Sequence, residues 1–527
     1  MRQLLLAGKC TARRRGGHGP TTHYWRVIET AAKVLLIGFY NEKALGVQYL
    51  ANALKKKGFD PHILFFKEFN SVRPRKASEK ELSLLDGLVS EIGPAYIGLS
   101  VMSSLYLETV HTVSIKLREK STAPVIWGGV YSTLFPERAL EYCDYVIRGE
   151  GENALPELIE KLENGIKAYD TANLAYWDES GKAVINDVRP LVQALDELGY
   201  PDIADENRYF IHEDRMDRGA FMRNSFTYEL SASRGCPFAC SYCSSINLNR
   251  LYRNKGRYVR FRSVDSVIDE LKAAKKYMRY LSAIHFWDEI FSDEEGWVEE
   301  FRDKYRKEIG LPFNIWGHPL KVRERTVACL VEAGLRQMVV GIQSGSMRVR
   351  KEVFNRPETQ EQIVEAGRIL SKCRVPKVIY DFMLGHPFEN TEDLRETYRL
   401  CLELEHPFRL QLHGLNFLPG TDITGKAVEA GLLSAKELEK IMYGSIQHQY
   451  DMYWGPAAAG RAKNDSVWLS LIYLTQFEPI KPLAGRLAAS VEKGGPAFAA
   501  MRLHQAMKKL SLCLGLVDKA KLALHFR

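Results

Sequence analysis

The sequence predicts an α/β protein in which a doubly wound parallel sheet is followed by further β/α units and then by a helical region. Short apolar runs alternate with amphipathic helical patterns over residues 33–166, and the same alternation returns over residues 226–424. From residue 425 to residue 527 only the helical pattern remains. Because a domain usually holds ~100–200 residues, a chain of 527 residues suits about two to four domains.

Composition and charge indicate a cytoplasmic protein. Apolar residues make up 46% and charged residues 26%, which suits sizeable cores beneath a polar surface. No stretch approaches the ~20 apolar residues of a membrane span, and Leu4–Ala7 is shorter than the ~7–15 apolar residues of a signal peptide. The formal charge of +8 is small for this length and mostly spread along the chain, so neither a membrane nor a nucleic acid is an expected partner.

The exception to this even spread is a basic tail, residues 1–32. Arg13, Arg14, Arg15 and Arg26 crowd together there. A basic tail can act as an interaction arm, but a disordered or misassigned start is the favoured interpretation.

The first predicted domain, residues 33–166, consists of short strands separated by helices. The strands are expected at residues 34–39, 62–66, 96–101, 125–128 and 145–149. The helices are expected at residues 47–57, 79–92, 105–119, 136–142 and 156–162. Strands joined by helical crossovers form an open parallel sheet, and such a sheet binds ligands at the carboxyl ends of its strands.

Those strand ends carry residues that a ligand crevice would use. Asn41 and Gly46 follow the first strand, Ser103 follows the third, and Gly128 and Gly129 follow the fourth. A Gly-Glu-Gly-Glu loop follows the fifth. Glycine lets a large ligand approach the backbone, and serine offers a hydroxyl group. Each loop alone is explained equally well as ordinary turn chemistry, but together the loops favour a crevice.

The spacing of these residues resembles the cobalamin-binding domains of the methionine synthase type. That family has Asp-x-His-x-x-Gly after the first strand, where this chain has Asn41, Lys43 and Gly46. Its later Ser-x-Leu and Gly-Gly match Ser103–Leu105 and Gly128–Gly129. The resemblance implies a flavodoxin-like sheet that binds cobalamin.

Lys43 stands in the place of the family's cobalt-ligating histidine. A protonated lysine has no lone pair to offer cobalt. The resemblance therefore implies cobalamin with its nucleotide tail detached and no lower histidine ligand, or else a relic domain that has lost corrin binding.

Residues 167–225 are predicted to be a linker between the domains. A hairpin is expected in which residues 173–177 pair with residues 182–186. The stretch that follows, residues 194–206, is polar. We expect this linker to connect the domains without taking part in chemistry.

Three of the nine cysteines are clustered, at Cys236, Cys240 and Cys243. In a long cytoplasmic chain, cysteines serve metal or redox chemistry more often than disulfides. The Cys-x3-Cys-x2-Cys spacing lets three thiolates hold three corners of an iron–sulfur cube, and without a fourth cysteine nearby one iron keeps an open position. The alternatives are a plain electron-transfer cluster and a zinc site, although zinc normally needs a fourth Cys or His close by.

The same spacing is typical of the radical S-adenosylmethionine superfamily, and Tyr242 matches the aromatic residue that the superfamily places before the last cysteine. The resemblance implies a [4Fe–4S] cluster on these cysteines whose open iron binds the amino and carboxylate groups of S-adenosylmethionine. It also implies one-electron reduction, by a donor such as flavodoxin or ferredoxin, to form a 5′-deoxyadenosyl radical.

The second predicted domain, residues 226–424, supplies strands that suit the partial TIM-like (β/α)6 barrel of that superfamily. The strands are expected at residues 227–230, 283–287, 313–317, 337–342, 377–384 and 411–417. A barrel of this kind collects its active site at the carboxyl ends of its strands.

Polar residues occupy several of those strand ends. By resemblance, Asp288 and Glu289 hold the methionine ammonium group, and Gln343 and Ser344 contact the ribose and the methionine. Arg356 follows on the next turn as a further cofactor contact. The alternative for Asp288 and Glu289 is a solvated helix start.

The C-terminal region, residues 425–527, reads as helices at residues 436–447, 467–477 and 497–515. A polar and aromatic cluster within residues 447–454 suits a substrate pocket, although ordinary packing against the barrel is the favoured interpretation.

A cobalamin-like sheet before a radical barrel resembles the cobalamin-dependent radical S-adenosylmethionine enzymes, and the resemblance covers residues 33–424. It implies methyl transfer to an unactivated carbon or phosphorus centre of a small molecule. One alternative is a non-methylating radical cyclase or rearrangement enzyme of the anaerobic porphyrin cyclase type. Another is a non-catalytic corrin or cluster sensor, and Asp288, Glu289 and the segment Gln343–Ser346 count against it.

Overall fold

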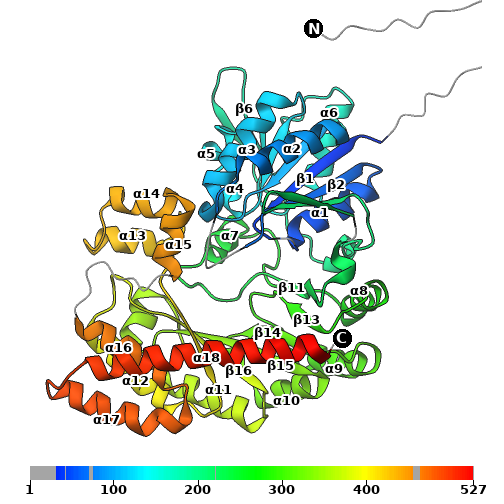
Figure 1. The fold of residues 1–527 in the computed structure, drawn as a ribbon. Helices are drawn as coiled ribbons and strands as arrows, with labels where there is room; N and C mark the ends of the chain where they lie inside the picture. The colour runs from blue at the N-terminus through cyan, green and yellow to red at the C-terminus, as the bar shows by residue number, and fades with distance from the viewer. Residues whose placement is uncertain (1–30, 42, 70–74, 220, 455–462, 526–527) are drawn as a thin grey trace, which may run out of the picture. The chain divides into compact units, whose positions relative to one another are not determined.

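The computed structural model describes residues 31–41, 43–69, 75–219, 221–454 and 463–525. The described residues from Ala32 onward form one compact unit. The predicted basic tail lies outside the described residues, apart from residues 31 and 32. Two large sheets and a helical C-terminal region make up the unit, which confirms the predicted fold class (Figure 1).

The first sheet has nine strands in the order β7-β6-β5-β4-β3-β1-β2-β8-β9. The predicted strands are β1 (Lys33–Phe39), β2 (Asp60–Phe66), β3 (Tyr96–Ser100), β4 (Val125–Gly128) and β5 (Tyr145–Ile147). These strands pair in parallel, so their carboxyl ends reach one edge of the sheet. The order β2-β1-β3-β4-β5 is that of a flavodoxin-like, doubly wound sheet.

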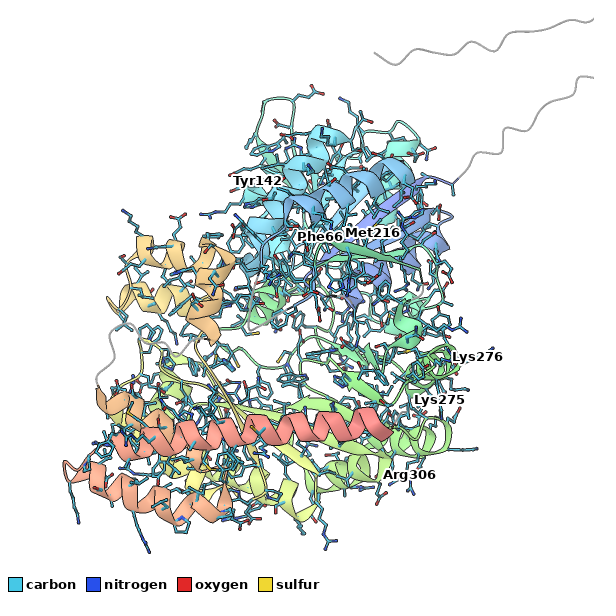
Figure 2. All side chains as sticks on the ribbon, in the orientation of Figure 1. Phe66, Tyr142, Met216, Lys275, Lys276 and Arg306 are labelled. Carbon is cyan, nitrogen blue, oxygen red and sulfur yellow. The ribbon has the colours of Figure 1, made fainter. Side chains whose placement is uncertain are left out.

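Helices cover both faces of this sheet. The helices α1 (Leu45–Lys56) and α6 (Ala154–Glu163) pack on one face, and α2 (Glu79–Ile92) and α3 (Leu107–Lys120) pack on the other. Each helix turns one apolar stripe inward, at the three- and four-residue spacing of a helix. Phe66 lies in the core beneath α2 and α3, where Met216 packs against the same cluster (Figure 2).

The predicted linker supplies both edges of the sheet. The strands β6 (Leu174–Trp177) and β7 (Ala183–Ile185) form the predicted hairpin. The sequence pattern does not predict β8 (Arg208–His212), which runs parallel to β2, or its partner β9 (Arg215–Arg218). The strand β8 begins with Arg208, a charged residue that does not suggest a buried strand. Arg208 is nevertheless buried, because its guanidinium donates to Gln48 Oε1 at 2.9 Å and to the carbonyl of Asp202 at 2.6 Å.

The second sheet has six parallel strands in the order β10-β13-β14-β15-β16-β17. They are β10 (Thr227–Leu230), β13 (Ala283–Phe286), β14 (Phe313–Gly317), β15 (Leu335–Gln343), β16 (Lys377–Met383) and β17 (Arg409–His413). The last strand ends before the predicted residue 417, because Leu415 and Phe417 pack in a separate small core.

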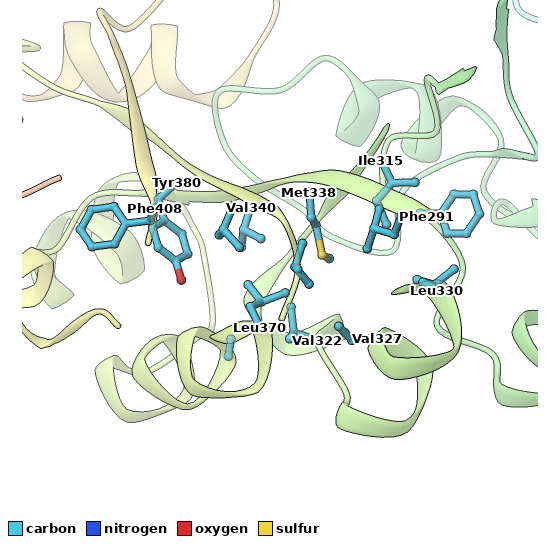
Figure 3. Packing of buried hydrophobic residues seen from close by; sticks show 14 of the residues in the cluster. Phe291, Ile315, Val322, Val327, Leu330, Met338, Val340, Leu370, Tyr380 and Phe408 are labelled. Carbon is cyan, nitrogen blue, oxygen red and sulfur yellow. The ribbon is translucent and has the colours of Figure 1, made fainter. Parts of the chain in front are cut away.

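The outer face of this barrel sheet is covered by α8 (Val264–Tyr277), α9 (Glu295–Glu308), α10 (Glu324–Ala333), α11 (Gln360–Lys372) and α12 (Thr391–Glu403). Met338 and Val340 of β15 and Tyr380 of β16 belong to the same buried core as Leu330 and Leu370 from the helices (Figure 3). This core fixes where the carboxyl ends of the strands lie.

The inner face of the barrel sheet is polar. Because side chains alternate along a strand, Glu229, His285, Asn314 and Asp381 point away from the helix-covered face. The amide nitrogen of Asn314 lies 3.1 Å from His285 Nε2. A purely structural barrel core is filled mainly by branched apolar residues, so this inner face suits a polar ligand.

The C-terminal region divides into two parts. The helices α13 (Asp422–Glu429), α14 (Ala435–Tyr443) and α15 (Ile446–Trp454) come first, and Ile446 and Tyr450 join the core of the first sheet. The helices α16 (Lys463–Leu474), α17 (Lys481–Glu492) and α18 (Phe498–His525) pack on the barrel, where α18 runs along α16 (Figure 1).

The polar and aromatic cluster predicted within residues 447–454 lies on α15, which packs against the first sheet domain. Gln449 Nε2 donates to the carbonyl of Ser104 in the first sheet domain at 3.2 Å. The side chains of Tyr453 and Trp454 lie outside the described residues.

Within the described part of the chain, no helix is long and apolar enough to cross a bilayer.

Candidate cofactor and active site

The clustered cysteines lie on a loop that follows the short strand β11 (Ser233–Arg234). Gly235, directly before Cys236, has a φ of +90°, and a Cβ atom there would lie 2.4 Å from the carbonyl oxygen of Tyr258. Glycine alone fits this position. Because β11 pairs with β12 (Arg260–Phe261), the strand pair fixes where the loop begins.

The middle of this cluster loop is anchored on the segment after β15. The backbone N–H of Ser241 donates to the carbonyl of Phe354 at 3.0 Å, and its hydroxyl donates to the carbonyl of Val353 at 2.6 Å. The side chain of Asn355 donates to the carbonyl of Ala239 at 2.7 Å. The loop is therefore held by backbone contacts that do not depend on a bound metal.

The thiols of the cluster loop influence one another. Burial raises the pKa of Cys236 to about 12 and that of Cys243 to about 11, and charge on Cys240 adds to both shifts. Within the described part of the chain, no three His, Cys, Asp or Glu side chains surround a single metal-ion position. Three thiols on one loop suit an iron–sulfur cluster in which one iron keeps an open position.

Arg356 and Tyr242 contact each other and the cluster loop. The guanidinium of Arg356 donates to the carbonyl of Gly341 at 2.6 Å, to the hydroxyl of Tyr242 at 3.1 Å and to Cys240 Sγ at 3.9 Å. Glu358 accepts from Arg356 Nε at 2.6 Å. The structure thus places both predicted cofactor contacts against the loop, and Arg356 brings positive charge to one thiol.

Asp288 and Glu289 have different surroundings. Asp288 is 2% exposed and accepts hydrogen bonds from the backbone N–H of Ala232, at 3.2 Å, and from the hydroxyl of Ser233. Burial raises the pKa of Asp288 to about 6, although these hydrogen bonds oppose the shift. Glu289 is exposed and lines the cavity described below. Of the two carboxylates, Glu289 is the one placed to reach a ligand.

Gln343 and Ser344 also differ. Gln343 has a φ of +72°, and its buried Oε1 has no hydrogen-bond partner among the described residues. Such strain in a residue other than glycine is typical of functional sites. Ser344 is fully buried, and its hydroxyl accepts from the backbone N–H of Ser346 at 3.2 Å. The orphaned oxygen of Gln343 suits a donor group on a cofactor, and Ser344 shapes the turn beside it.

A cavity of about 380 Å³ opens beside the cluster loop, within the ~300–1,000 Å³ of small-molecule sites. Its wall combines strand ends of the first sheet, leucines of the linker and residues around the cluster loop. These include Met102, Gly128, Gly151, Leu191, Leu195, Leu198, Gly235, Trp287 and Glu289. Ligands at the sheet edge and at the cluster loop would therefore share one space.

Some residues of the predicted corrin-binding frame line this cavity, and the others make hydrogen bonds elsewhere. Gly46, Gly128 and Gly129 line the cavity, and a Cβ atom at Gly46 or Gly128 would meet no atom within 3.6 Å. This bare backbone suits a large flat ligand. Asn41 Oδ1 accepts from the backbone N–H of Lys43 at 2.8 Å, and Ser103 Oγ caps the next turn by accepting from Leu105. The Lys43 ammonium points to β10, where Thr227 Oγ1 accepts its hydrogen bond at 2.6 Å.

The Gly-Glu-Gly-Glu loop joins the sheet to the start of the cluster loop, a role that sequence reasoning missed. Glu150 lies 2.6 Å from Arg260 and 3.3 Å from Arg234, and Glu152 lies 2.6 Å from Arg234. Burial alone would raise the pKa of Glu150, but Arg260 and Arg234 lower it overall. The signal in the sequence was the pair of acidic residues in this loop and Arg234 two positions before Cys236.

A buried pair of an aspartate and a histidine on the inner face of the barrel is expected to make stability depend on pH. Asp381 oxygens lie 3.1 and 3.2 Å from His413 Nε2, and His413 Nδ1 lies 3.0 Å from the carbonyl of Gly414. Burial lowers the pKa of His413, but the bond to Asp381 outweighs it and raises the pKa overall. A raised histidine pKa gives stability that is fully present below the unfolded value of about 6.5 and is lost as the pH rises through the folded pKa.

We therefore expect Asp381→Asn to lower the free energy of unfolding by about 1–2 kcal/mol at acidic pH and by less above the folded pKa of His413. Urea unfolding at about pH 5.5 and about pH 9 measures the difference. In a His413→Asn background the same change should lose its pH dependence. An equal loss of stability at both pH values in the wild-type background would contradict this assignment.

Two family models match the chain. A B12 binding domain matches residues 37–159, and the radical SAM superfamily matches residues 230–401. The first match spans the sheet loops of the cavity, and the second spans the cluster loop and the ends of β13 and β15. The chain therefore contains both a B12 binding domain and a radical SAM domain. These domains imply a [4Fe–4S] cluster, S-adenosylmethionine and cobalamin as cofactors.

Similar curated proteins include methyltransferases and a cyclase. An uncharacterized methyltransferase of Pyrococcus horikoshii is 26% identical over 67% of this chain and 76% of its own length. Cytidylyl-2-hydroxyethylphosphonate methyltransferase of Streptomyces wedmorensis is 25% identical over 67% and 72%. Anaerobic magnesium-protoporphyrin IX monomethyl ester cyclase of Rubrivivax gelatinosus is 24% identical over 67% and 61%.

Solved structures of related architecture share the fold. The radical S-adenosylmethionine methyltransferase TsrM of Kitasatospora setae, solved with tryptophan substrate and a SAM analogue, has a TM-score of 0.60 at 19% identity and covers 76% of each chain. The cobalamin-dependent S-adenosylmethionine radical enzyme OxsB has a TM-score of 0.56 at 19% identity, covering 77% of this chain and 56% of its own. At this identity the likeness shows the fold alone.

Proposed function

We propose that this enzyme uses cobalamin and S-adenosylmethionine to transfer a methyl group to an unactivated carbon or phosphorus centre of a small molecule. The observation that carries the proposal is the shared cavity, in which Gly128 and Gly129 of the predicted corrin frame line the same space as Glu289 beside the cluster loop. Methyl donor, radical source and substrate would then meet in one space. The methyltransferases among the similar proteins support this reaction type.

In this proposal the three clustered cysteines hold the [4Fe–4S] cluster, and Tyr242 and Arg356 keep their loop in place. Glu289 and Gln343 orient S-adenosylmethionine, because the carboxylate is exposed to the cavity and the amide oxygen has an unused lone pair. When bound, the cofactors supply an electron for cleavage of S-adenosylmethionine and a methyl group for transfer. The electron would come from a small redox protein such as flavodoxin or ferredoxin.

A radical cyclase is the second candidate, because anaerobic magnesium-protoporphyrin cyclases match 67% of the chain, as large a share as the methyltransferases match. The two reactions differ in their products, because methyl transfer adds the mass of a CH2 unit to the substrate and oxidative cyclisation adds no methyl carbon. A non-catalytic sensor fits less well, because it would not need the accessible carboxylate of Glu289 or the strained backbone of Gln343.

Anaerobic reconstitution with iron, sulfide and hydroxocobalamin tests the proposal. The protein should then hold iron and corrin together and should convert S-adenosylmethionine to 5′-deoxyadenosine once reduced. With methyl-labelled S-adenosylmethionine, the label should also reach the corrin. Formation of 5′-deoxyadenosine without any bound corrin would favour a radical enzyme of another type over a cobalamin-dependent methyltransferase.

The cobalt of bound cobalamin is expected to lack a nitrogen ligand on its lower face. Lys43 replaces the ligating histidine, and its ammonium is engaged with Thr227 and Glu229. Electron paramagnetic resonance of the cob(II)alamin state should show no nitrogen superhyperfine splitting. A splitting of that kind would contradict the ligand-free state, and absence of bound cobalt would defeat the cobalamin assignment.

A further inference from the structure

Lys43 ties the first loop of the sheet to the barrel. Its ammonium donates to Thr227 Oγ1 at 2.6 Å and lies 3.2 Å from Glu229 Oε1. Both partners belong to β10, the first barrel strand. The side chains of Lys43 and Glu229 are only 12% and 16% exposed, so solvent and salt screen the pair weakly. Lys43, which stands in the place of the family's metal ligand, thus forms an ion pair between the first sheet domain and the barrel.

Glu229 also holds one wall of the cavity. Its second carboxylate oxygen accepts the indole N–H of Trp287 at 2.8 Å. Trp287 directly follows β13 and lines the cavity, and 47% of it is exposed. Its ring stacks on Trp316 with a centroid distance of 6.1 Å. Because a half-exposed indole has few packing neighbours, this hydrogen bond and this stacking contact set its orientation.

The other wall starts at the backbone of Lys43. Gln48 Nε2 donates to the Lys43 carbonyl at 3.0 Å, at the first turn of α1. Leu45 and Gly46, which open that helix, line the cavity. One contact between a lysine and a glutamate therefore connects residues of both walls.

We propose that Lys43, Glu229 and Trp287 form a latch that holds the two walls of the cavity in register and turns the face of Trp287 toward bound cobalamin. Lys43 and Glu229 are then positioning residues, and Trp287 is a contact residue for the corrin. The corrin contact rests on the proposed function, whereas the latch itself is a property of the protein alone.

Titration of hydroxocobalamin into the cluster-loaded protein, followed by absorbance, tests the corrin contact. Lys43→Met and Glu229→Gln should each raise the Kd about tenfold, because each leaves a partly buried charged or polar partner unpaired. Trp287→Phe, which keeps a ring and loses the N–H donor, should raise it by a smaller factor. Lys55→Met is the matched control, because it breaks the ion pairs of α1 with Asp202 and Asp205 without touching the latch.

The charge-swapped variant Lys43→Glu/Glu229→Lys separates a latch from a simple tether. It restores an ion pair between the loop and β10, but the lysine at position 229 cannot accept the indole N–H of Trp287. We expect its Kd to recover only to the value of Trp287→Phe, and adding Trp287→Phe to it should change nothing further. Full recovery to the wild-type Kd would overturn the role of Trp287, and wild-type affinity in both single charge variants would overturn the effect of the latch on corrin binding.

Hydrogen exchange of α1 measures the latch without any cofactor. Amides at the start of α1 should exchange faster in Lys43→Met and Glu229→Gln, and at the wild-type rate in the charge-swapped variant. Unchanged exchange in both single variants would overturn the latch even if cobalamin binds. If the wild-type protein binds no cobalamin, the corrin contact of Trp287 and the proposed function fail together, and the exchange rates still decide whether the latch exists.

Discussion

Replacing Cys236, Cys240 and Cys243 together with alanine is expected to abolish the [4Fe–4S] cluster, and each single replacement should also lose it. The reason is that thiolates are the ligands that hold an iron–sulfur cluster, and alanine supplies none. Iron and acid-labile sulfide after anaerobic reconstitution measure the result, against about four irons per chain in the wild-type protein.

The loop itself should survive this change, since its anchors at Ser241 and Asn355 are hydrogen bonds to backbone carbonyls. Cys373→Ala is the matched control, because Cys373 is a half-buried thiol at the end of α11, outside the cluster loop. It should keep full iron content. A triple variant that still carries about four irons per chain would exclude these cysteines as the cluster ligands.

Glu289→Gln is expected to weaken S-adenosylmethionine binding roughly tenfold to hundredfold, the cost of losing one charge-assisted hydrogen bond. Its neighbour Asp288 should behave in the opposite way. Asp288→Asn disturbs the bonds to Ala232 and Ser233, so it should lower the free energy of unfolding by ~1–3 kcal/mol and leave the Kd for S-adenosylmethionine nearly unchanged in the folded protein. Equilibrium dialysis and thermal unfolding measure the two quantities.

The contrast between these adjacent carboxylates is the informative result. Gln343→Ala is a useful companion, because its buried amide oxygen has no hydrogen-bond partner among the described residues and its removal should add to the loss in Glu289→Gln. Wild-type affinity in Glu289→Gln, or a loss of affinity in Asp288→Asn at unchanged stability, would reverse the roles assigned to the pair.

The regular parts of the fold were predictable because most of the parallel strands are short apolar runs, and the helices between them each have one apolar stripe. The start and end of α2, for example, follow from the Ser78 cap and from Gly93 in the left-handed region. β8 was not predictable, because its buried Arg208 depends on Gln48, which is 160 residues away in the chain. A side chain that is buried only by a distant partner leaves no local pattern.

The candidate site likewise has residues that the sequence predicted and residues whose roles depend on distant partners. The sequence singled out the clustered cysteines by their spacing, and Glu289 and Gln343 by their place at strand ends and by resemblance to the radical S-adenosylmethionine superfamily. It could not separate Glu289 from Asp288, since their difference lies in which carboxylate meets the backbone of Ala232. The fate of Lys43 was equally hidden, because its partners Thr227 and Glu229 belong to the other half of the molecule.

The linker has a consequence for how this molecule can be divided. Its leucines line the cavity, and its backbone is bonded on both sides, by Asn52 to the carbonyl of Leu198 at 2.7 Å and by Arg260 to the carbonyl of Val192 at 2.8 Å. A corrin carrier and a radical barrel expressed as separate modules would each lack part of the binding surface. The connecting segment therefore serves as part of the binding surface, and the cavity is complete only when all three parts belong to one folded chain.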